Sequence, residues 1–403
     1  MKAAIMGYGT IGSGVYEVLD KNCKSVEKKA GEPIEVKYIL DLREFPGSPV
    51  EKLVIHDVEQ IVNDPEIGIV VETMGGTKPA YEFVRRCLLA GKHVVTSNKA
   101  LVAANGTELI RIAAEKNISF LFEASVGGGI PIIRPLVECL GGEEILEISG
   151  ILNGTTNYIL TKMNEEGWSF EEALRRAQEL GYAERNPETD IEGYDTCRKI
   201  AILTAVATGK EVNYEEIPTQ GITKITSMDS SYAAHMGAAI KLFGTSVNKD
   251  GKIYLEVAPV LVDAKDPLYA VTDVFNGILV VGNMLGASMF YGSGAGKLPT
   301  ASAVVGDMIS AVRFGDEPEK IGWSSEKLEV HPAAELSRKY FARFEGSERA
   351  KKEAVAAAFG DVKFVTLEGT DEFAVLTGEM TGGEFDSAAA KVGGLRQKIA
   401  ARL

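Results

Sequence analysis

Residues 2–14 read KAAIMGYGTIGSG, a short apolar run followed by closely spaced glycines. The run Lys2–Met6 predicts a buried strand, and apolar residues at helical spacing predict a helix over Ile11–Lys29. Three glycines stand between them in the pattern G-x-G-x-x-G, namely Gly7, Gly9 and Gly12. A strand, a glycine-rich turn and a helix in this order predict the first unit of a parallel α/β sheet.

Each glycine of this turn has its own physical role when a dinucleotide binds. The first permits the tight turn, the second lets a pyrophosphate approach the backbone, and the third lets helix and strand pack closely. Thr10 and Ile11 stand at the helix N-terminus, where free N–H groups and the positive end of the helix dipole attract an anion. We therefore predict that this turn binds NAD or NADP.

The alternation of strands and helices continues to about residue 130. Further strands are predicted over Glu35–Leu40, Ile67–Glu72, His93–Thr96 and Ser119–Glu123. Helices are predicted over Asp57–Val62, Pro79–Ala90 and Gly106–Lys116. Right-handed crossovers between such strands give a parallel sheet. We predict a Rossmann dinucleotide-binding domain over residues 1–130, completed by a helix over 299–316.

The end of the second predicted strand carries both signals for the ribose. Asp41 can accept hydrogen bonds from a ribose 2′-OH, which favours NAD, and Arg43 can pair with a 2′-phosphate, which favours NADP. Because both residue types are present, the sequence does not decide between the two cofactors. For Arg43, a solvated charge in a loop is an equally simple interpretation.

After about residue 130 the pattern indicates an α+β domain over residues 131–298. Strands are predicted over Ile145–Ile151, Ile253–Leu261, Gly277–Val281 and Ser288–Tyr291. Helices are predicted over Asn157–Glu165, from Ser169 to Gly181, and over Asp195–Thr208. Asp316–Lys320 resembles a linker.

Residues 334–403 predict a small ferredoxin-like module. Strands are expected over Ser337–Phe344, Val362–Leu367 and Glu372–Thr381, and helices over Ser347–Phe359 and Glu384–Ile399. In this interpretation the chain lacks the last strand of a βαββαβ order.

Composition excludes several classes of partner. The formal net charge of −14 disfavours nucleic acid and anionic membranes, since both are bound through basic surfaces. The four cysteines are widely spaced, and no signal peptide or long apolar segment is evident. We expect a cytoplasmic enzyme with reduced thiols.

Several motifs occur together and in order along residues 1–316. They are VVTSNKAL at 94–101, EASVGGGIP at 123–131, LNGTTNYIL at 152–160, GYAE at 181–184, DIEGYD at 190–195 with Lys199, and GAG at 294–296 before PTASAV at 299–304. In these motifs the chain resembles the homoserine dehydrogenase family. The resemblance implies reversible NAD(P)H-dependent reduction of L-aspartate 4-semialdehyde to L-homoserine, on the route to threonine, methionine and isoleucine. It also implies that residues 131–298 bind the substrate and form a homodimer.

Lys199 is the first candidate for the proton donor. It lies four residues after Asp195, so the two side chains share one face of a helix that is largely apolar. Long charged side chains are rarely buried without a task. The resemblance gives Lys199 the proton-donor role and makes Lys99 the second catalytic lysine, which would orient the substrate oxygen or relay protons close to the cofactor. The sequence does not decide which of the two lysines gives the proton directly. It makes Glu184 and Asp195 ligands of the substrate ammonium, although Glu184 alone would be taken for an exposed loop carboxylate.

The resemblance also implies two further sets of contacts. Gly181 and Gly296 match positions that approach the cofactor, although as isolated glycines they are equally a helix cap and a turn. A sodium ion is held in the family by backbone carbonyls that match Glu123, Val126, Gly128 and Ile130. A hinge loop without an ion is the competing interpretation.

The C-terminal module loosely resembles the ACT regulatory domain, which senses threonine. Where those domains have an Asp-x-Pro-Gly turn, this chain has Glu345-Gly346-Ser347-Glu348, which argues against feedback inhibition. A module that only dimerises is the competing interpretation, and the sequence does not decide whether it binds an effector. Two other functions compete with the main one. A semialdehyde dehydrogenase would need a nucleophilic cysteine with a histidine partner, and no convincing motif supplies one. A non-catalytic NAD(P)-sensing protein could dispense with the lysines and carboxylates that this chain retains.

Overall fold

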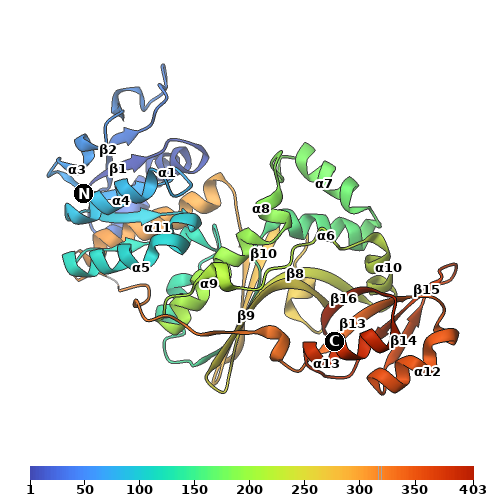
Figure 1. Ribbon diagram of the computed structural model, residues 1–403. Coiled ribbons are helices and arrows are strands. Elements are labelled where there is room, and N and C mark those ends of the chain that lie inside the picture. The colour runs from blue at the N-terminus through green and yellow to red at the C-terminus, as the bar shows by residue number, and fades with distance from the viewer. Residues whose placement is uncertain (316, 319) are drawn as a thin grey trace. The chain divides into compact units, whose positions relative to one another are not determined.

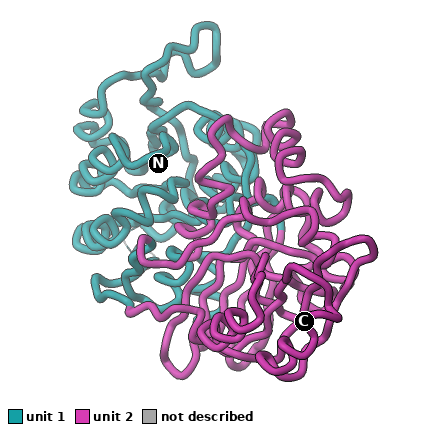
Figure 2. The backbone as a smooth tube through the Cα atoms, turned by 45° about the vertical axis from the view of Figure 1, so that its right-hand side comes forward, with its two compact units in different colours: residues 1–143, 201–214, 292–328 teal, residues 144–200, 215–291, 329–403 magenta. Residues whose placement is uncertain are grey.

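The computed structural model describes residues 1–403 apart from Asp316 and Glu319, and its chain divides into two compact units (Figures 1 and 2). Unit 1 contains residues 1–143, 201–214 and 292–328. Unit 2 contains residues 144–200, 215–291 and 329–403. The predicted linker 316–320 includes the two residues outside the described part of the chain.

Unit 1 is built on a parallel sheet of six strands in the order β3-β2-β1-β4-β5-β6. The strands are β1 (Lys2–Met6), β2 (Glu35–Leu40), β3 (Val54–Ile55), β4 (Ile67–Glu72), β5 (His93–Thr96) and β6 (Phe120–Leu121). All neighbouring pairs are parallel. This is the strand order of a Rossmann fold, as predicted, and the order reverses next to β1, where the glycine turn begins.

The helices of unit 1 are connections between these strands. They are α1 (Thr10–Lys21), α2 (Cys23–Ala30), α3 (Glu59–Val62), α4 (Ala80–Leu89), α5 (Lys99–Lys116) and, from the later part of the chain, α11 (Lys297–Phe314). In Figure 1, α4 and α5 lie side by side, and α1 packs against α11. Helix α11 therefore belongs to unit 1, although it follows most of unit 2 in the sequence.

Two predictions for unit 1 need correction. The single helix expected over Ile11–Lys29 is broken at Asn22, whose ψ of 16° ends α1 and starts α2. The helix expected to start at Gly106 starts at Lys99, because the Asn98 side chain accepts a hydrogen bond from the Leu101 amide and caps it.

Unit 2 is built on one long mixed sheet with the order β11-β10-β7-β8-β9-β16-β13-β15-β14. Its first five strands are β7 (Ile145–Ile151), β8 (Ala238–Lys249), β9 (Lys252–Asp263), β10 (Phe275–Gly282) and β11 (Gly286–Ser293). Strand β8 was not predicted, since Lys241 and Gly244 interrupt its apolar pattern. Lys241 is nevertheless buried, and its amino group donates to the Val271 carbonyl.

The helices of unit 2 precede or follow these strands. They include α6 (Gly154–Glu166), α7 (Phe170–Glu179), α8 (Glu188–Ile191) and α10 (Ser227–His235). Helix α9 (Tyr194–Thr208) begins in unit 2, and its residues from Ala201 onward belong to unit 1. Helices α6 and α10 both pack against β8, and α7 packs against α6. Ser169 caps α7, because its hydroxyl accepts from the Glu172 amide at 3.2 Å. Helix α9 is buried over most of its length, as expected from Ile200, Ile202 and Leu203.

The C-terminal module has the complete βαββαβ order, so the expected absence of its last strand was wrong. Its elements are β13 (Lys339–Glu345), α12 (Glu348–Phe359), β14 (Lys363–Thr366), β15 (Glu372–Leu376), α13 (Gly382–Val392) and β16 (Leu395–Arg402). Gly393 and Gly394 take positive φ values of 69° and 71° and end the helix, and the chain then returns as a strand. Strand β16 pairs with β13 and also, in parallel, with β9. The module is therefore ferredoxin-like and continues the sheet of unit 2.

No helix among the described residues is long and apolar enough to cross a membrane.

Candidate active site

The glycine turn in unit 1 has the tight geometry that its sequence predicted. Gly7 has a φ of +94°, a conformation that side chains disfavour. A Cβ atom at Gly12 would lie 1.9 Å from the Gly7 carbonyl oxygen, so only glycine allows this helix to approach the turn. The Gly7 amide donates to the Leu40 carbonyl at 2.8 Å, and the Thr73 hydroxyl donates to the Gly7 carbonyl at 2.8 Å. Gly9, with open space where a Cβ would stand, precedes Thr10 and Ile11 in the first turn of α1.

Asp41 and Arg43 form a pair beside this turn. The Arg43 guanidinium donates to both carboxylate oxygens of Asp41 at 2.9 Å, and the Tyr8 amide donates to the same carboxylate at 2.7 Å. The hydrogen bonds from the Arg43 side chain contribute most to holding the pKa of Asp41 well below its usual value, and backbone amides contribute further. Arg43 itself remains exposed. Both ribose-binding candidates therefore lie at the carboxyl end of β2, next to the glycine turn.

Lys99 is the first residue of α5 and follows a network that the sequence did not reveal. Glu72, at the end of β4, is fully buried and accepts hydrogen bonds from the Thr96 hydroxyl at 2.6 Å and the Met74 amide at 2.8 Å. The Asn98 amide group donates to Glu72 at 3.4 Å and to the Gly76 carbonyl at 2.6 Å. Burial raises the pKa of Glu72. Glu72 thus joins the ends of β4 and β5 and fixes the turn that presents Lys99.

In unit 2, Lys199 and Asp195 form a buried ion pair at 2.8 Å. Their exposed fractions are 7% and 2%. The Lys199 amino group also donates to the Leu152 carbonyl at 2.7 Å, in the turn between β7 and α6. The surface ion pair that the four-residue spacing also permits is therefore excluded, and the predicted burial is confirmed.

Asn153 lies between two carboxylates of this group. Its side-chain amide nitrogen donates to Asp195 at 2.9 Å and to Asp190 at 2.8 Å. The sequence placed both Asn153 and Asp190 inside family motifs without a role for either. Tertiary structure brings both residues to Asp195, because Asn153 lies before α6 and Asp190 lies on α8, whereas Asp195 lies on α9.

Glu184 and Gly181 lie on the exposed loop after α7, outside this buried group. Gly181 has a φ of +77° just beyond the helix end, as a helix-terminating glycine does. The Glu184 carbonyl accepts from the Gln178 side chain at 3.1 Å, and the Thr155 hydroxyl donates to the Tyr182 carbonyl at 2.6 Å. The second bond ties the loop to the first turn of α6, next to Asn153.

The remaining predicted ligands lie in the glycine-rich loop 123–130 and before α11. The Glu123 carboxylate is occupied by the amides of Ile132, Ile133 and Arg134, at 2.6–2.8 Å. The loop is closely packed: a Cβ atom at Gly127 would lie 2.4 Å from the Ile130 carbonyl oxygen, and one at Gly128 would lie 2.3 Å from the Gly294 carbonyl oxygen. Val126 is buried within it. Gly296 has a φ of +121° and precedes the first residue of α11.

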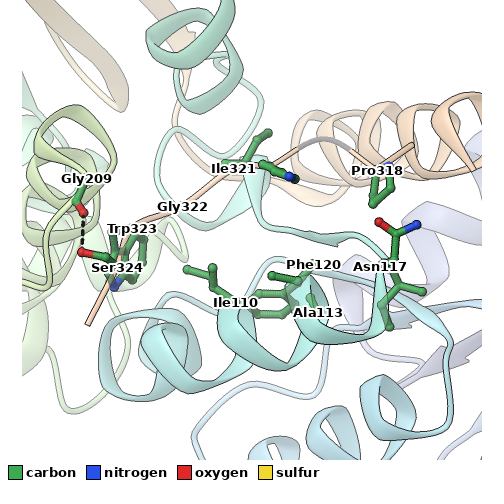
Figure 3. A pocket seen from close by; sticks show the side chains of 13 residues that line it. Ile110, Ala113, Asn117, Phe120, Gly209, Pro318, Ile321, Gly322, Trp323 and Ser324 are labelled. Carbon is green, nitrogen blue, oxygen red and sulfur yellow. Dashed lines mark hydrogen bonds between the residues drawn. The ribbon is translucent and has the colours of Figure 1, made fainter. Parts of the chain in front are cut away.

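A cavity of about 360 Å³ in unit 1 contains none of the predicted site residues (Figure 3). It lies between the C-terminal half of α5 and the segment that includes Pro318 and Trp323. The Trp323 indole donates to the Thr107 hydroxyl at 2.9 Å, and a side chain at Gly106 would collide with its ring. This cavity is mainly apolar and separate from the glycine turn.

The Rossmann order, the glycine turn and the buried lysine–carboxylate pair define the class of dinucleotide-dependent oxidoreductases. Residues 7–123 match the family model described as homoserine dehydrogenase, NAD binding domain, and residues 131–309 match the one described as homoserine dehydrogenase. The homoserine dehydrogenase of Synechocystis is 42% identical over 361 residues, which cover 85% of this chain and 82% of that protein. The chain belongs to the homoserine dehydrogenase family.

Solved structures agree with this assignment. A homoserine dehydrogenase from Thiobacillus denitrificans superposes with a TM-score of 0.90 at 32% identity, covering 100% of this chain and 98% of that one. A hyperthermophilic archaeal homoserine dehydrogenase in complex with NADPH gives a TM-score of 0.65 at 27% identity, covering 77% and 97%. The activity is therefore the NAD(P)-dependent interconversion of L-aspartate 4-semialdehyde and L-homoserine in amino-acid biosynthesis. Burial raises the pKa of the Cys87 thiol to about 12, so this cysteine is a poor candidate for the nucleophile of a semialdehyde dehydrogenase.

Proposed function

We propose that Lys199 gives the proton to the substrate oxygen during aldehyde reduction and takes it back during homoserine oxidation. The observation that carries this role is its burial between the Asp195 carboxylate at 2.8 Å and the Leu152 carbonyl at 2.7 Å. These contacts hold the amino group in one position, which proton transfer requires. Asp195 orients the lysine and, with Glu184, supplies negative charge for the substrate ammonium.

In unit 1, Gly7, Gly9 and Gly12, with the first turn of α1, would hold the pyrophosphate. When bound, the nicotinamide ring supplies or accepts the hydride. Gly181 and Gly296 are further candidate contacts to the dinucleotide. Lys99, at the N-terminus of α5, is proposed to orient the substrate oxygen near the ring.

A coupled absorbance assay tests the catalytic proposal. Purified protein is given L-homoserine with NAD or with NADP, and formation of the reduced nicotinamide is followed. Lys199→Ala should lower kcat by about 10²-fold or more while dinucleotide affinity, measured by fluorescence titration, is retained. Near-normal kcat in that variant would move the proton-donor role elsewhere, first to Lys99.

The choice between NAD and NADP is proposed to depend on the Asp41–Arg43 pair. A 2′-phosphate would need Arg43 to leave Asp41, whereas a ribose hydroxyl would need the carboxylate itself. Arg43→Ala should raise KM for NADP by about tenfold and leave KM for NAD nearly unchanged. Asp41→Ala should raise KM for NAD and leave KM for NADP nearly unchanged. Equal effects of each variant on both cofactors would contradict this assignment.

We propose a monovalent cation, sodium, as a structural ligand of the loop 123–130. The carbonyls of Glu123, Val126, Gly128 and Ile130 are oxygen donors of the type that hard cations prefer. The Gly127 position supports this, because any side chain there would meet the Ile130 carbonyl. Replacement of sodium by choline in the buffer should lower the thermal midpoint if the cation is held.

A homodimer is proposed to form through unit 2. Strand β11 lies at the edge of its sheet, and the exposed side chains along it include Met289 and Tyr291. Phe275 stacks on Tyr291 at 5.4 Å and extends this apolar surface. Met289→Lys should shift the light-scattering mass toward the monomer.

We also propose that the enzyme is located in the cytoplasm. For the C-terminal module we propose that it does not sense threonine, and a threonine titration that leaves activity unchanged would support this.

A further inference from the structure

Both ends of the Asn153 side chain are engaged, and each end has a different task. Its oxygen accepts from the Thr156 amide at 2.9 Å and so caps the N-terminus of α6. Its nitrogen donates to Asp190 at 2.8 Å and to Asp195 at 2.9 Å. Asn153 is 6% exposed, so these bonds lie largely away from water.

The cap fixes which way the amide faces. A flip would place the amide nitrogen against the Thr156 amide, where two donors would meet, and would place the oxygen against two carboxylates. Both contacts would be repulsive. Helix α6 thereby orients the amide donors toward Asp190 and Asp195.

The carboxylates beside Asn153 carry like charges at close range. One oxygen of each lies within 3 Å of the same nitrogen, and the Asp195 oxygen also contacts the Lys199 ammonium. A neutral amide satisfies both carboxylates without adding charge, whereas a lysine or arginine at this position would compete with Lys199 for Asp195. The charge around Lys199 in unit 2 therefore depends on Asp195 directly and on Asp190 through Asn153.

We infer that Asn153 is a positioning residue for the reaction: it holds Asp195 against Lys199 and, with Asp190, sets the charge that surrounds the lysine. This inference rests on the proton-transfer role proposed for Lys199. We assign Asn153 no contact with the reacting atoms or the cofactor, and it acts through its hydrogen bond to Asp195.

Two near-isosteric substitutions test the inference with opposite signs. Asn153→Asp keeps an oxygen for the α6 cap and adds a negative charge, so it should favour the protonated lysine. The pH–rate limb of homoserine oxidation should move to higher pH, with kcat near neutrality lowered about tenfold. Asp190→Asn keeps an acceptor for the Asn153 amide and removes a charge, so the limb should move to lower pH.

Ser169→Ala is the matched control, because it removes a helix cap, at α7, away from the carboxylates. It should lower the thermal midpoint and leave the pH profile in place. Asn153→Ser keeps a capping hydroxyl but removes the amide, so it should fold and lose kcat with little change in the dinucleotide KM. Coincident pH profiles for wild type, Asn153→Asp and Asp190→Asn would overturn the inference.

Failure of the inference about Asn153 can be distinguished from failure of the proton-donor role proposed for Lys199. If Lys199→Ala abolishes turnover and the two charge variants leave the profile unmoved, only the role of Asn153 fails. If Lys199→Ala retains turnover, the proposed proton donor fails, and the inference about Asn153 fails with it.

Discussion

Each unit contains a buried asparagine that caps a helix and donates a hydrogen bond to a carboxylate. The two units differ in the other partners of that carboxylate. In unit 1, Asn98 caps α5 and donates to Glu72, whose other described partners are neutral hydroxyl and amide donors. In unit 2, Asn153 caps α6 and donates to Asp195, which also meets the Lys199 ammonium. The same local arrangement thus places a carboxyl group among neutral donors in one unit and against an ammonium group in the other.

This difference separates a structural role from a chemical one. A carboxylate held by neutral donors becomes harder to ionise on burial, which agrees with the raised pKa of Glu72. A carboxylate held against an ammonium keeps its charge and can orient a proton donor. We therefore expect changes at Glu72 to act on stability, and changes around Lys199 to act on turnover.

The largest expected effect is on turnover at the two lysines. Lys199→Ala should lower kcat by about 10²-fold or more, and Lys99→Ala by about tenfold, because we assign Lys99 an orienting role. Circular dichroism of both variants provides the control for folding. A larger loss of kcat at Lys99 than at Lys199 would reverse the roles assigned to the two lysines.

The next effect is on stability at Glu72. Glu72→Ala leaves the Thr96 hydroxyl and the Met74 amide without their acceptor, so it should lower the free energy of unfolding by about 1–3 kcal/mol. Glu72→Gln keeps an oxygen for the amides and should recover most of this loss. Urea unfolding of both variants measures the difference, and equal losses would show that hydrogen bonding is not the cause.

A smaller effect is the pH dependence of that stability. Because burial raises the pKa of Glu72, the folded chain binds a proton there more tightly than the unfolded chain does. The ionised carboxylate destabilises the fold above the raised pKa, and this penalty is absent below the ordinary glutamate value of 4.5. Wild type should therefore gain stability relative to Glu72→Gln as the pH falls from about 7.5 to about 5. Parallel stability curves for the two proteins would contradict this expectation.

Sequence alone predicted those parts of the site that local spacing determines. The glycine turn follows from three residues within one βα unit, and the Lys199–Asp195 pair follows from the helical repeat. Glu72 and Asn153 were missed as site residues because their partners come from other elements, and no periodicity signals such contacts. The start of α5 was misplaced because the Asn98 cap was not recognised.

The C-terminal module shows a different limit. The helix predicted through Ile399 followed small and apolar residues that suit either secondary structure. Pairing with β13 and β9 decides in favour of a strand, and Gly393 and Gly394 end the helix before it. Long-range pairing of this kind outweighs local preference.

The C-terminal module covers part of one edge of strand β9. Its outer edge is covered by β16 along Val260–Val262 and by β12 (Val330–Pro332) along Ile253–Leu255. Removal of residues 329–403 would uncover Ile253–Leu255 and Val260–Val262 of this strand, while Val257 would keep its hydrogen bonds to Pro218 and Gln220. Bare edges of this kind recruit other chains. By covering part of this edge, the C-terminal strands would limit pairing of β9 with other chains, independently of any effector.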